Sequence, residues 1–181
     1  MNAMRKYAVW IVALGLAVFI FWKATILFIG VIGKIGSSSQ PTVKPQASEP
    51  YEPPFRQDGT IYAVNDQDTV ATFRGEYAKT PESIEIGMMY RRSVSPDMAM
   101  LFFMDGGDRP RSFWMKNTLV SLDIIYINAN NEVVSIQANA QPLNTTSLPS
   151  EAPASYVLEV LGGTAATWGI EKGTTITWSD N

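Results

Sequence analysis

Four side chains that could bind a ligand lie within ten positions of one another. They are an indole, an ammonium, a carboxamide and a carboxylate, at Trp114, Lys116, Asn117 and Asp123. On a strand over 112–116, Trp114 and Lys116 would share one face, because side chains alternate across a strand. An indole beside polar groups suits ligand recognition, so we predict a binding site here. In the structural alternative, the indole packs, Asn117 caps a turn and Lys116 pairs with Asp123.

Arg91 is the fifth candidate binding residue. Arg91 and Arg92 follow a predicted helix, where cations complement the negative end of the helix dipole. The alternative is that Arg91 turns inward and either pairs with Asp123 or binds an anionic ligand, since a guanidinium matches carboxylate geometry. The sequence leaves both alternatives open.

The residue types that are missing narrow the chemistry. The chain has no Cys and no His. Thiol nucleophiles and thiolate metal sites are therefore excluded, and so is the usual proton carrier at neutral pH. A metal would need oxygen ligands, and the calcium-loop pattern is absent. We therefore assign no catalytic residue, no metal and no cofactor.

Paired carboxylates are the one catalytic arrangement left to consider. Asp105, Asp108 and Asp123 are the acids nearest the aromatic motif. Two carboxylates about 5–9 Å apart could support glycoside hydrolysis. Nothing in the spacing requires such a pair, and the two glycines between Asp105 and Asp108 are more typical of a turn. A hydrolase of envelope glycans is therefore an alternative and not the main hypothesis.

Short strands and two short helices would position these residues. Short β-type runs predict strands over 60–64, 69–77, 100–104, 112–116, 122–127, 132–137, 155–160 and 174–178. The first two of these runs alternate apolar and polar residues, and 100–104 is predicted to be a buried strand. A helix should begin after Thr80, which is a good N-cap before Pro81, and run to about Tyr90. A second helix should cover 162–168. These elements predict a compact α+β domain dominated by antiparallel strands.

The N-terminal region predicts a single membrane span. Residues 7–32 contain one charge, Lys23, and are long enough to cross a bilayer as a helix. Because Arg5 and Lys6 precede the span, its N-terminus should stay in the cytoplasm. The chain would then sit in the inner membrane with its C-terminal domain on the periplasmic or outer side. The alternative is a signal peptide cleaved near residues 36–38.

Composition divides the chain into three parts. We assign residues 1–35 to the anchor, 36–57 to a Pro- and Ser-rich linker, and 58–181 to the domain. Residues 1–56 hold six of the fourteen Lys and Arg but only two of the seventeen acids, so the domain is acidic. An acidic domain without a basic cluster argues against nucleic acid as a partner.

Residues 68–178 resemble domain-of-unknown-function family 192. The stretches that carry the resemblance are 87–91, 100–103, 112–118, 122–123, 156–160, 163–166 and 169–173. Its most specific part is the string Phe-Trp-Met-Lys-Asn-Thr, which begins at Phe113. The resemblance implies a small, mainly β, barrel-like domain, with no established activity. Many members carry a Cys in the loop that corresponds to 141–149, and its absence here puts any thiol or metal role of that loop in doubt.

These observations predict a membrane-anchored, extracytoplasmic, non-enzymatic binding or accessory module. The bilayer would be one partner, through residues 7–32, and a membrane protein or envelope component the other. Two alternatives remain: an accessory subunit of a larger membrane complex, and the glycan hydrolase with paired carboxylates.

Overall fold

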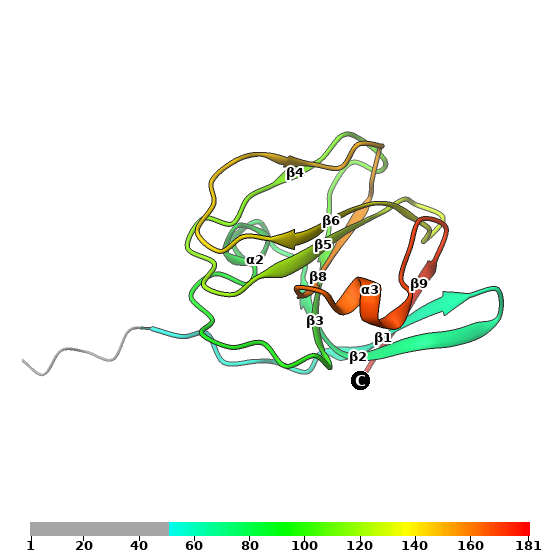
Figure 1. The fold of residues 1–181 in the computed structure, drawn as a ribbon, viewed down its shortest axis with the longest axis horizontal. Helices are drawn as coiled ribbons and strands as arrows, with labels where there is room; N and C mark the ends of the chain where they lie inside the picture. The colour runs from blue at the N-terminus through cyan, green and yellow to red at the C-terminus, as the bar shows by residue number, and fades with distance from the viewer. Residues whose placement is uncertain (1–50) are drawn as a thin grey trace, which may run out of the picture. The chain divides into compact units, whose positions relative to one another are not determined.

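The computed structural model describes residues 51–181, which form a mainly β domain with two short helices (Figure 1). The strands of its main sheet are β1 (Gly59–Asn65), β2 (Asp68–Ala78), β3 (Met98–Phe103), β5 (Leu122–Ile127), β6 (Val133–Ala140), β8 (Tyr156–Leu161) and β9 (Thr175–Asp180). The helices are α2 (Pro81–Ile86) and α3 (Thr164–Trp168), and a second small sheet pairs β4 (Ser112–Phe113) with β7 (Leu148–Pro149).

The predicted membrane span, residues 7–32, lies outside the described residues, as does most of the predicted linker. Within residues 51–181, no helix is long and apolar enough to cross a membrane.

The seven-stranded sheet has the order β6-β5-β8-β3-β2-β1-β9. Its neighbouring strands are antiparallel except for β2 and β3, which run parallel. A parallel pair needs a crossover connection, and the chain between β2 and β3 contains α2. The predicted dominance of antiparallel strands is confirmed, and the sheet is nevertheless mixed.

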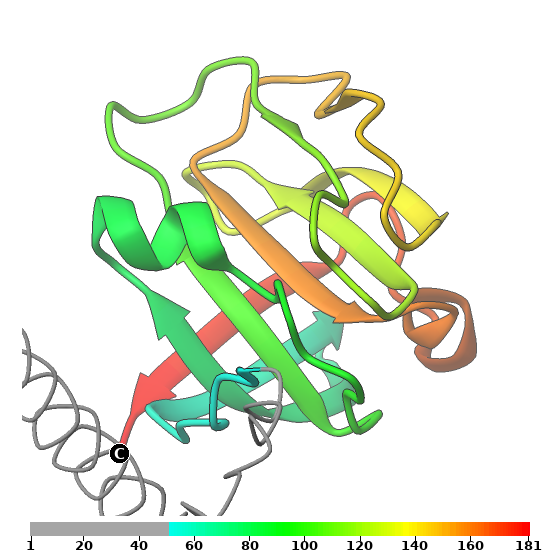
Figure 2. The same ribbon diagram turned by 90° about the vertical axis from the view of Figure 1, so that its left-hand side faces the viewer.

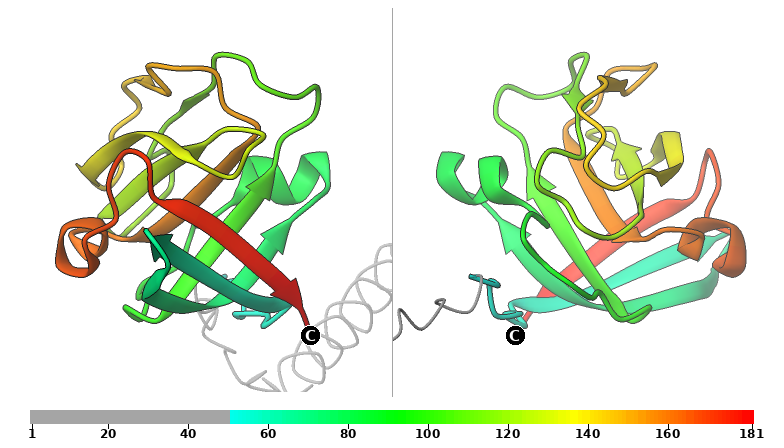
Figure 3. Two further views of the ribbon diagram at one scale, coloured as in Figure 1. Left: turned by 90° about the vertical axis from the view of Figure 1, so that its right-hand side faces the viewer. Right: turned by 60° about the vertical axis from the view of Figure 1, so that its left-hand side comes forward.

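The sheet is not closed, which corrects the expectation of a barrel-like domain. Its edge strands, β6 and β9, meet only near their first residues, through the bridge between Glu132 and Thr175 (Figure 3). The N–H of Val133 donates to the carbonyl of Thr174 over 2.9 Å at the same point. From Thr175 onward β9 pairs with β1, and beyond this bridge its other edge does not pair with β6.

Two cores lie on opposite faces of the sheet. Leu101, Ile125 and Leu158 belong to the first core. Met100 and Phe102, the residues on either side of Leu101, belong to the second. This separation follows from the alternation of side chains along a strand. The second core is covered by α2 and the segments that carry β4 and β7 (Figure 2).

Helix α2 begins where the sequence predicts and ends earlier. The hydroxyl of Thr80 accepts a hydrogen bond from the backbone N–H three residues on, which confirms the predicted N-cap. The helix ends at Ile86, and not near Tyr90, because Gly87 adopts φ 49° and ψ −132°. A side chain at Gly87 would also meet the ring of Phe102 at 3.0 Å. Glycine therefore lets the chain turn closely over the second core.

The strand predicted over 112–116 is only partly formed, because β4 ends at Phe113. The alternation of side chains nevertheless continues as predicted: Met115 is buried, whereas Trp114 and Lys116 are exposed. The chain then turns at Asn117, whose φ of 55° ends the extended segment. Asparagine tolerates this left-handed conformation better than most residues do.

Candidate functional site

Asp123, one of the five predicted binding residues, is fully buried and holds backbone N–H groups. Its Oδ1 atom accepts hydrogen bonds from the N–H of Asn139 at 2.8 Å and of Gly163 at 3.0 Å. Its Oδ2 atom accepts one from the N–H of Ala165 at 2.8 Å. Helix α3 has no side-chain cap of its own, so the carboxylate of Asp123 caps it from strand β5.

The expected ion pair between Asp123 and either Lys116 or Arg91 is therefore wrong. Within residues 51–181, neither Lys116 nor Arg91 forms a salt bridge with Asp123. The ammonium of Lys116 lies 5.1 Å from the centre of the Trp114 ring. Arg91 instead pairs with Glu76. The predicted residues thus occupy three places in the structure, and Asp123 stands apart from the other four.

Trp114, Lys116 and Asn117 lie on a surface made of three loops that are hydrogen-bonded to one another. The N–H of Tyr90 donates to the carbonyl of Asn117 over 2.9 Å, and the Asn117 amide donates to the Tyr90 hydroxyl over 2.9 Å. The third loop joins through the N–H of Leu143, which donates to the carbonyl of Thr118 over 3.0 Å. The loops near residues 90, 117 and 143 therefore form one connected unit.

This unit exposes several large apolar side chains. The exposed fractions are 40% for Tyr90, 48% for Trp114, 45% for Leu119 and 60% for Leu143. We name the surface the loop face and define it by Tyr90, Trp114, Lys116, Asn117, Leu119 and Leu143. Several exposed apolar residues on one surface are typical of interaction sites, whereas single ones need no explanation.

The backbone of the loop face is strained at two of these residues. Tyr90 has φ 66° and Leu143 has φ 61°, in the left-handed region that bulky side chains rarely adopt. Each such residue costs on the order of 1–3 kcal/mol, and such strain is concentrated at binding and switch regions. The strain at Tyr90 and Leu143 therefore favours a functional reading of this surface.

A groove of about 360 Å³ adjoins the loop face at Trp114. Its apolar lining comes from Ile84, Met104, Phe113 and Trp114, and its polar lining from Ser112, Thr145 and Ser147. The hydroxyl oxygens of Ser112 and Ser147 lie 2.7 Å apart and form a hydrogen bond with each other. A groove lined in this way, without a charged side chain, suits an apolar group with little or no charge.

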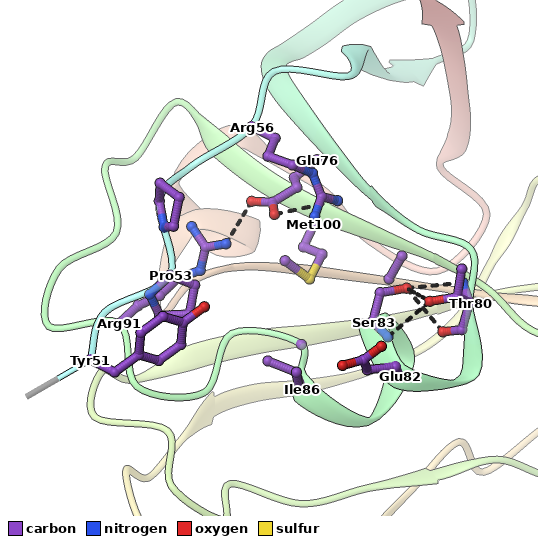
Figure 4. A pocket seen from close by; sticks show the side chains of 13 residues that line it. Tyr51, Pro53, Arg56, Glu76, Thr80, Glu82, Ser83, Ile86, Arg91 and Met100 are labelled. Atoms are coloured by element: carbon purple, nitrogen blue, oxygen red, sulfur yellow. Dashed lines mark hydrogen bonds and ion pairs between the residues drawn. The ribbon is translucent and has the colours of Figure 1, made fainter.

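The remaining predicted residue, Arg91, belongs to a second and buried site. Its Nη2 atom donates to Oε2 of Glu76 over 2.6 Å, and the two side chains are 5% and 3% exposed (Figure 4). Oε1 of Glu76 lies 3.5 Å from Nη2 of Arg56, whose side chain is half exposed. Of the two readings of Arg91, the inward one is correct, although its partner is Glu76 and not Asp123.

Glu159 is a second carboxyl group near Arg91. Burial raises its pKa to about 8, although the N–H of Met88 and the charge of Arg91 act in the opposite direction. The Oε2 atom of Glu159 and the Nε atom of Arg91 are both buried without a hydrogen-bond partner among the described residues. A buried carboxyl with a strongly shifted pKa beside a cation marks a candidate functional site.

The register of the sheet places the two buried acids on one face. Glu76 on β2 lies opposite Met100 on β3, which lies opposite Glu159 on β8. Directly opposed residues point to the same side of a sheet, so both acids face the second core. The sequence analysis missed Glu76 and Glu159. A single acid within the buried strand Tyr156–Leu161 was a signal that could have identified Glu159.

Two of the three acids considered for glycan hydrolysis, Asp108 and Asp123, have structural partners. Oδ1 of Asp108 accepts hydrogen bonds from the N–H of Ala129 at 2.8 Å and from the hydroxyl of Ser155 at 2.6 Å. Asp123 caps α3, as described above. No group of three or more Asp or Glu side chains within residues 51–181 could hold a metal ion.

Two solved structures are similar to this domain. One is a protein of unknown function from Novosphingobium aromaticivorans DSM 12444, with 33% identity and a TM-score of 0.62 over 66% of this chain and 84% of that one. The other, a candidate transcription regulator from Sinorhizobium meliloti 1021, has 32% identity and a TM-score of 0.64 over 67% of this chain and 93% of that one. No curated protein matches the chain.

A family model confirms the resemblance found in the sequence. The model, described as DUF192, Uncharacterized ACR, COG1430, matches residues 62–178, close to the predicted range of 68–178. The match covers the whole main sheet apart from the ends of its first and last strands. The chain therefore belongs to the DUF192 family.

Proposed function

We propose that this chain is a membrane-anchored binding module that docks a protein partner through the loop face. The apolar segment at residues 7–32 and the preceding Arg5 and Lys6 support an anchor with the domain on the periplasmic or outer side. The partner is a membrane or envelope protein, so the chain acts as an accessory subunit. It has no enzymatic role in this proposal.

The observation that carries the proposal is the half-exposed indole of Trp114 within the loop face. Interface energy is concentrated in a few residues, most often Trp, Tyr and Arg, and Trp114 and Tyr90 both lie on this surface. The ammonium of Lys116 over the indole supplies a charge beside the apolar groove. A protein partner can bury an apolar side chain in that groove and cover the surrounding loops.

The catalytic alternative receives no comparable support. Asp108 and Asp123 are committed to backbone and hydroxyl donors, and Glu76 is paired with Arg91. Glycan hydrolysis needs an acid and a second carboxylate that both reach one glycosidic bond. These partners favour binding over catalysis.

The test compares two tryptophans that are equally exposed. Trp114 is 48% exposed on the loop face, whereas Trp168 is 47% exposed on α3, at the opposite end of the domain from α2 (Figures 1 and 2). Full-length chain carrying Trp114→Ser or Trp168→Ser is purified from native membranes in mild detergent, and its co-purifying proteins are quantified. We expect Trp114→Ser to lose a specific partner that Trp168→Ser retains. Equal recovery of every partner by both variants would contradict the proposal.

A further inference from the structure

A cavity of about 410 Å³ lies between α2 and residues 51–56 (Figure 4). Met100 and Gly87 contribute to its lining, as does the buried pair of Glu76 and Arg91. Residues 51–56 precede β1 without regular secondary structure and supply one wall, including the ring of Tyr51. The cavity is separate from the groove beside Trp114, with which it shares no lining residue.

The guanidinium of Arg91 has one buried N–H group that lacks an acceptor among the described residues. It has five N–H donors. One of them is used by Glu76, and the buried Nε–H has no partner among the described residues. A buried donor left without an acceptor costs about 1–3 kcal/mol, so an incoming acceptor would be stabilised there. Arg91, whose side chain contributes to the wall of the cavity, therefore carries a donor that no described residue satisfies.

The charged groups around Arg91 do not exclude an anion from the cavity. The carboxylate of Glu76 is already engaged by Arg91 at 2.6 Å and approached by Arg56 at 3.5 Å. Glu159, whose pKa is raised to about 8, is mostly protonated at neutral pH and adds little repulsion. The exposed acid at the rim, Glu82, faces solvent, where its charge is screened.

The rest of the lining is suited to a small apolar body. Tyr51 is 71% exposed, although it is aromatic, and it lines the cavity together with Pro53 and Ile86. A ligand that filled the cavity would cover the ring of Tyr51 and pack against these side chains. Binding sites commonly combine such apolar walls with a few placed polar groups.

We propose that this cavity binds a small organic carboxylate, with the carboxylate on Arg91 and the apolar body against Tyr51. A guanidinium is the side chain best matched to a carboxylate. This inference does not rest on the loop face and would stand if the docking proposal failed.

The experiment uses benzoate as the probe and benzamide as its uncharged counterpart. The full-length chain in detergent micelles is labelled with ¹⁵N, and the Nε–H resonance of Arg91 is followed during each titration. We expect benzoate to shift this resonance saturably and benzamide not to do so. No saturable shift up to the solubility limit of benzoate, or an equal shift with benzamide, would overturn the proposal.

Two variants locate the bound probe. Tyr51→Ser, at an exposed position, should leave the melting temperature unchanged and weaken benzoate binding about tenfold. Trp168→Ser, far from the cavity on α3, should leave the affinity unchanged. The double variant Arg91→Met/Glu76→Met removes the ion pair as a unit and should abolish binding. Unchanged affinity in Tyr51→Ser, or an equal loss in Trp168→Ser, would contradict this site even if the double variant failed to fold.

Discussion

Arg91 donates a hydrogen bond of 2.6 Å to Glu76, and both side chains are buried. The chain also forms an exposed pair of similar length, between Arg74 and Asp97 at 2.7 Å, with side chains 41% and 53% exposed. Burial is the main difference between the two pairs. Breaking a buried pair strands a charge away from water, whereas breaking an exposed pair returns both groups to solvent.

Arg91→Met should therefore lower the free energy of unfolding by about 3–5 kcal/mol, because Glu76 is left buried without its main cation. Arg74→Met is the matched control and should cost about 0–1 kcal/mol. Urea denaturation followed by tryptophan fluorescence measures both. Losses of equal size would show that the Arg91–Glu76 pair is not buried as described.

Glu159 should make stability depend on pH. Burial raises its pKa from 4.5 to about 8, so the folded state holds a proton that the unfolded state releases in this window. The free energy of unfolding should therefore fall as pH rises from 4.5 to 8. Glu159→Gln keeps a neutral side chain of similar shape and should remove this decline. If melting experiments showed the same pH dependence of stability in both proteins across this window, the shifted pKa would be refuted.

Asp123→Asn should destabilise the domain, because an amide cannot accept all three backbone hydrogen bonds that the carboxylate accepts. The expected loss is about 1–3 kcal/mol. Lys116→Met should change stability by no more than about 0.5 kcal/mol, since Lys116 is exposed and does not pair with Asp123. If both variants lost the same amount, the original idea of a Lys116–Asp123 pair would return.

Membrane topology can be tested with protease added to intact spheroplasts. The long apolar run at residues 7–32, with Arg5 and Lys6 before it, predicts that the domain is removed while the anchor is protected. Survival of the domain until the membrane is lysed would contradict this orientation. Release of an intact domain without protease would instead indicate a signal peptide cleaved near residues 36–38.

The local features of this fold were predictable because they depend on neighbouring residues. Thr80 caps α2 through a group three residues away, and the buried Met115 follows from alternation along an extended segment. Contacts between distant segments were not predictable in this way. The cap that Asp123 provides requires Gly163 and Ala165, which follow β8, to lie close to β5, the strand that pairs with β8.

The candidate site shows the same division. The exposure of Trp114 and Lys116 followed from their alternation with Met115, so part of the loop face could be predicted from the sequence. The strain at Tyr90 and Leu143 arises where three loops meet, and no local pattern encodes that meeting. Arg91 turns inward, which was one of the two predicted alternatives, but its partner is Glu76, which lies fifteen residues earlier in the chain and in another element.

Photo-crosslinking in living cells tests the central claim, that the loop face docks a protein partner, most directly. A photoreactive amino acid is placed at position 114 in one full-length chain and at position 168 in another, since both side chains are about half exposed. Light should produce a discrete adduct with one envelope or membrane protein from position 114 only, and Leu143→Glu should abolish it. No adduct from position 114, or the same adduct from position 168, would contradict docking through the loop face.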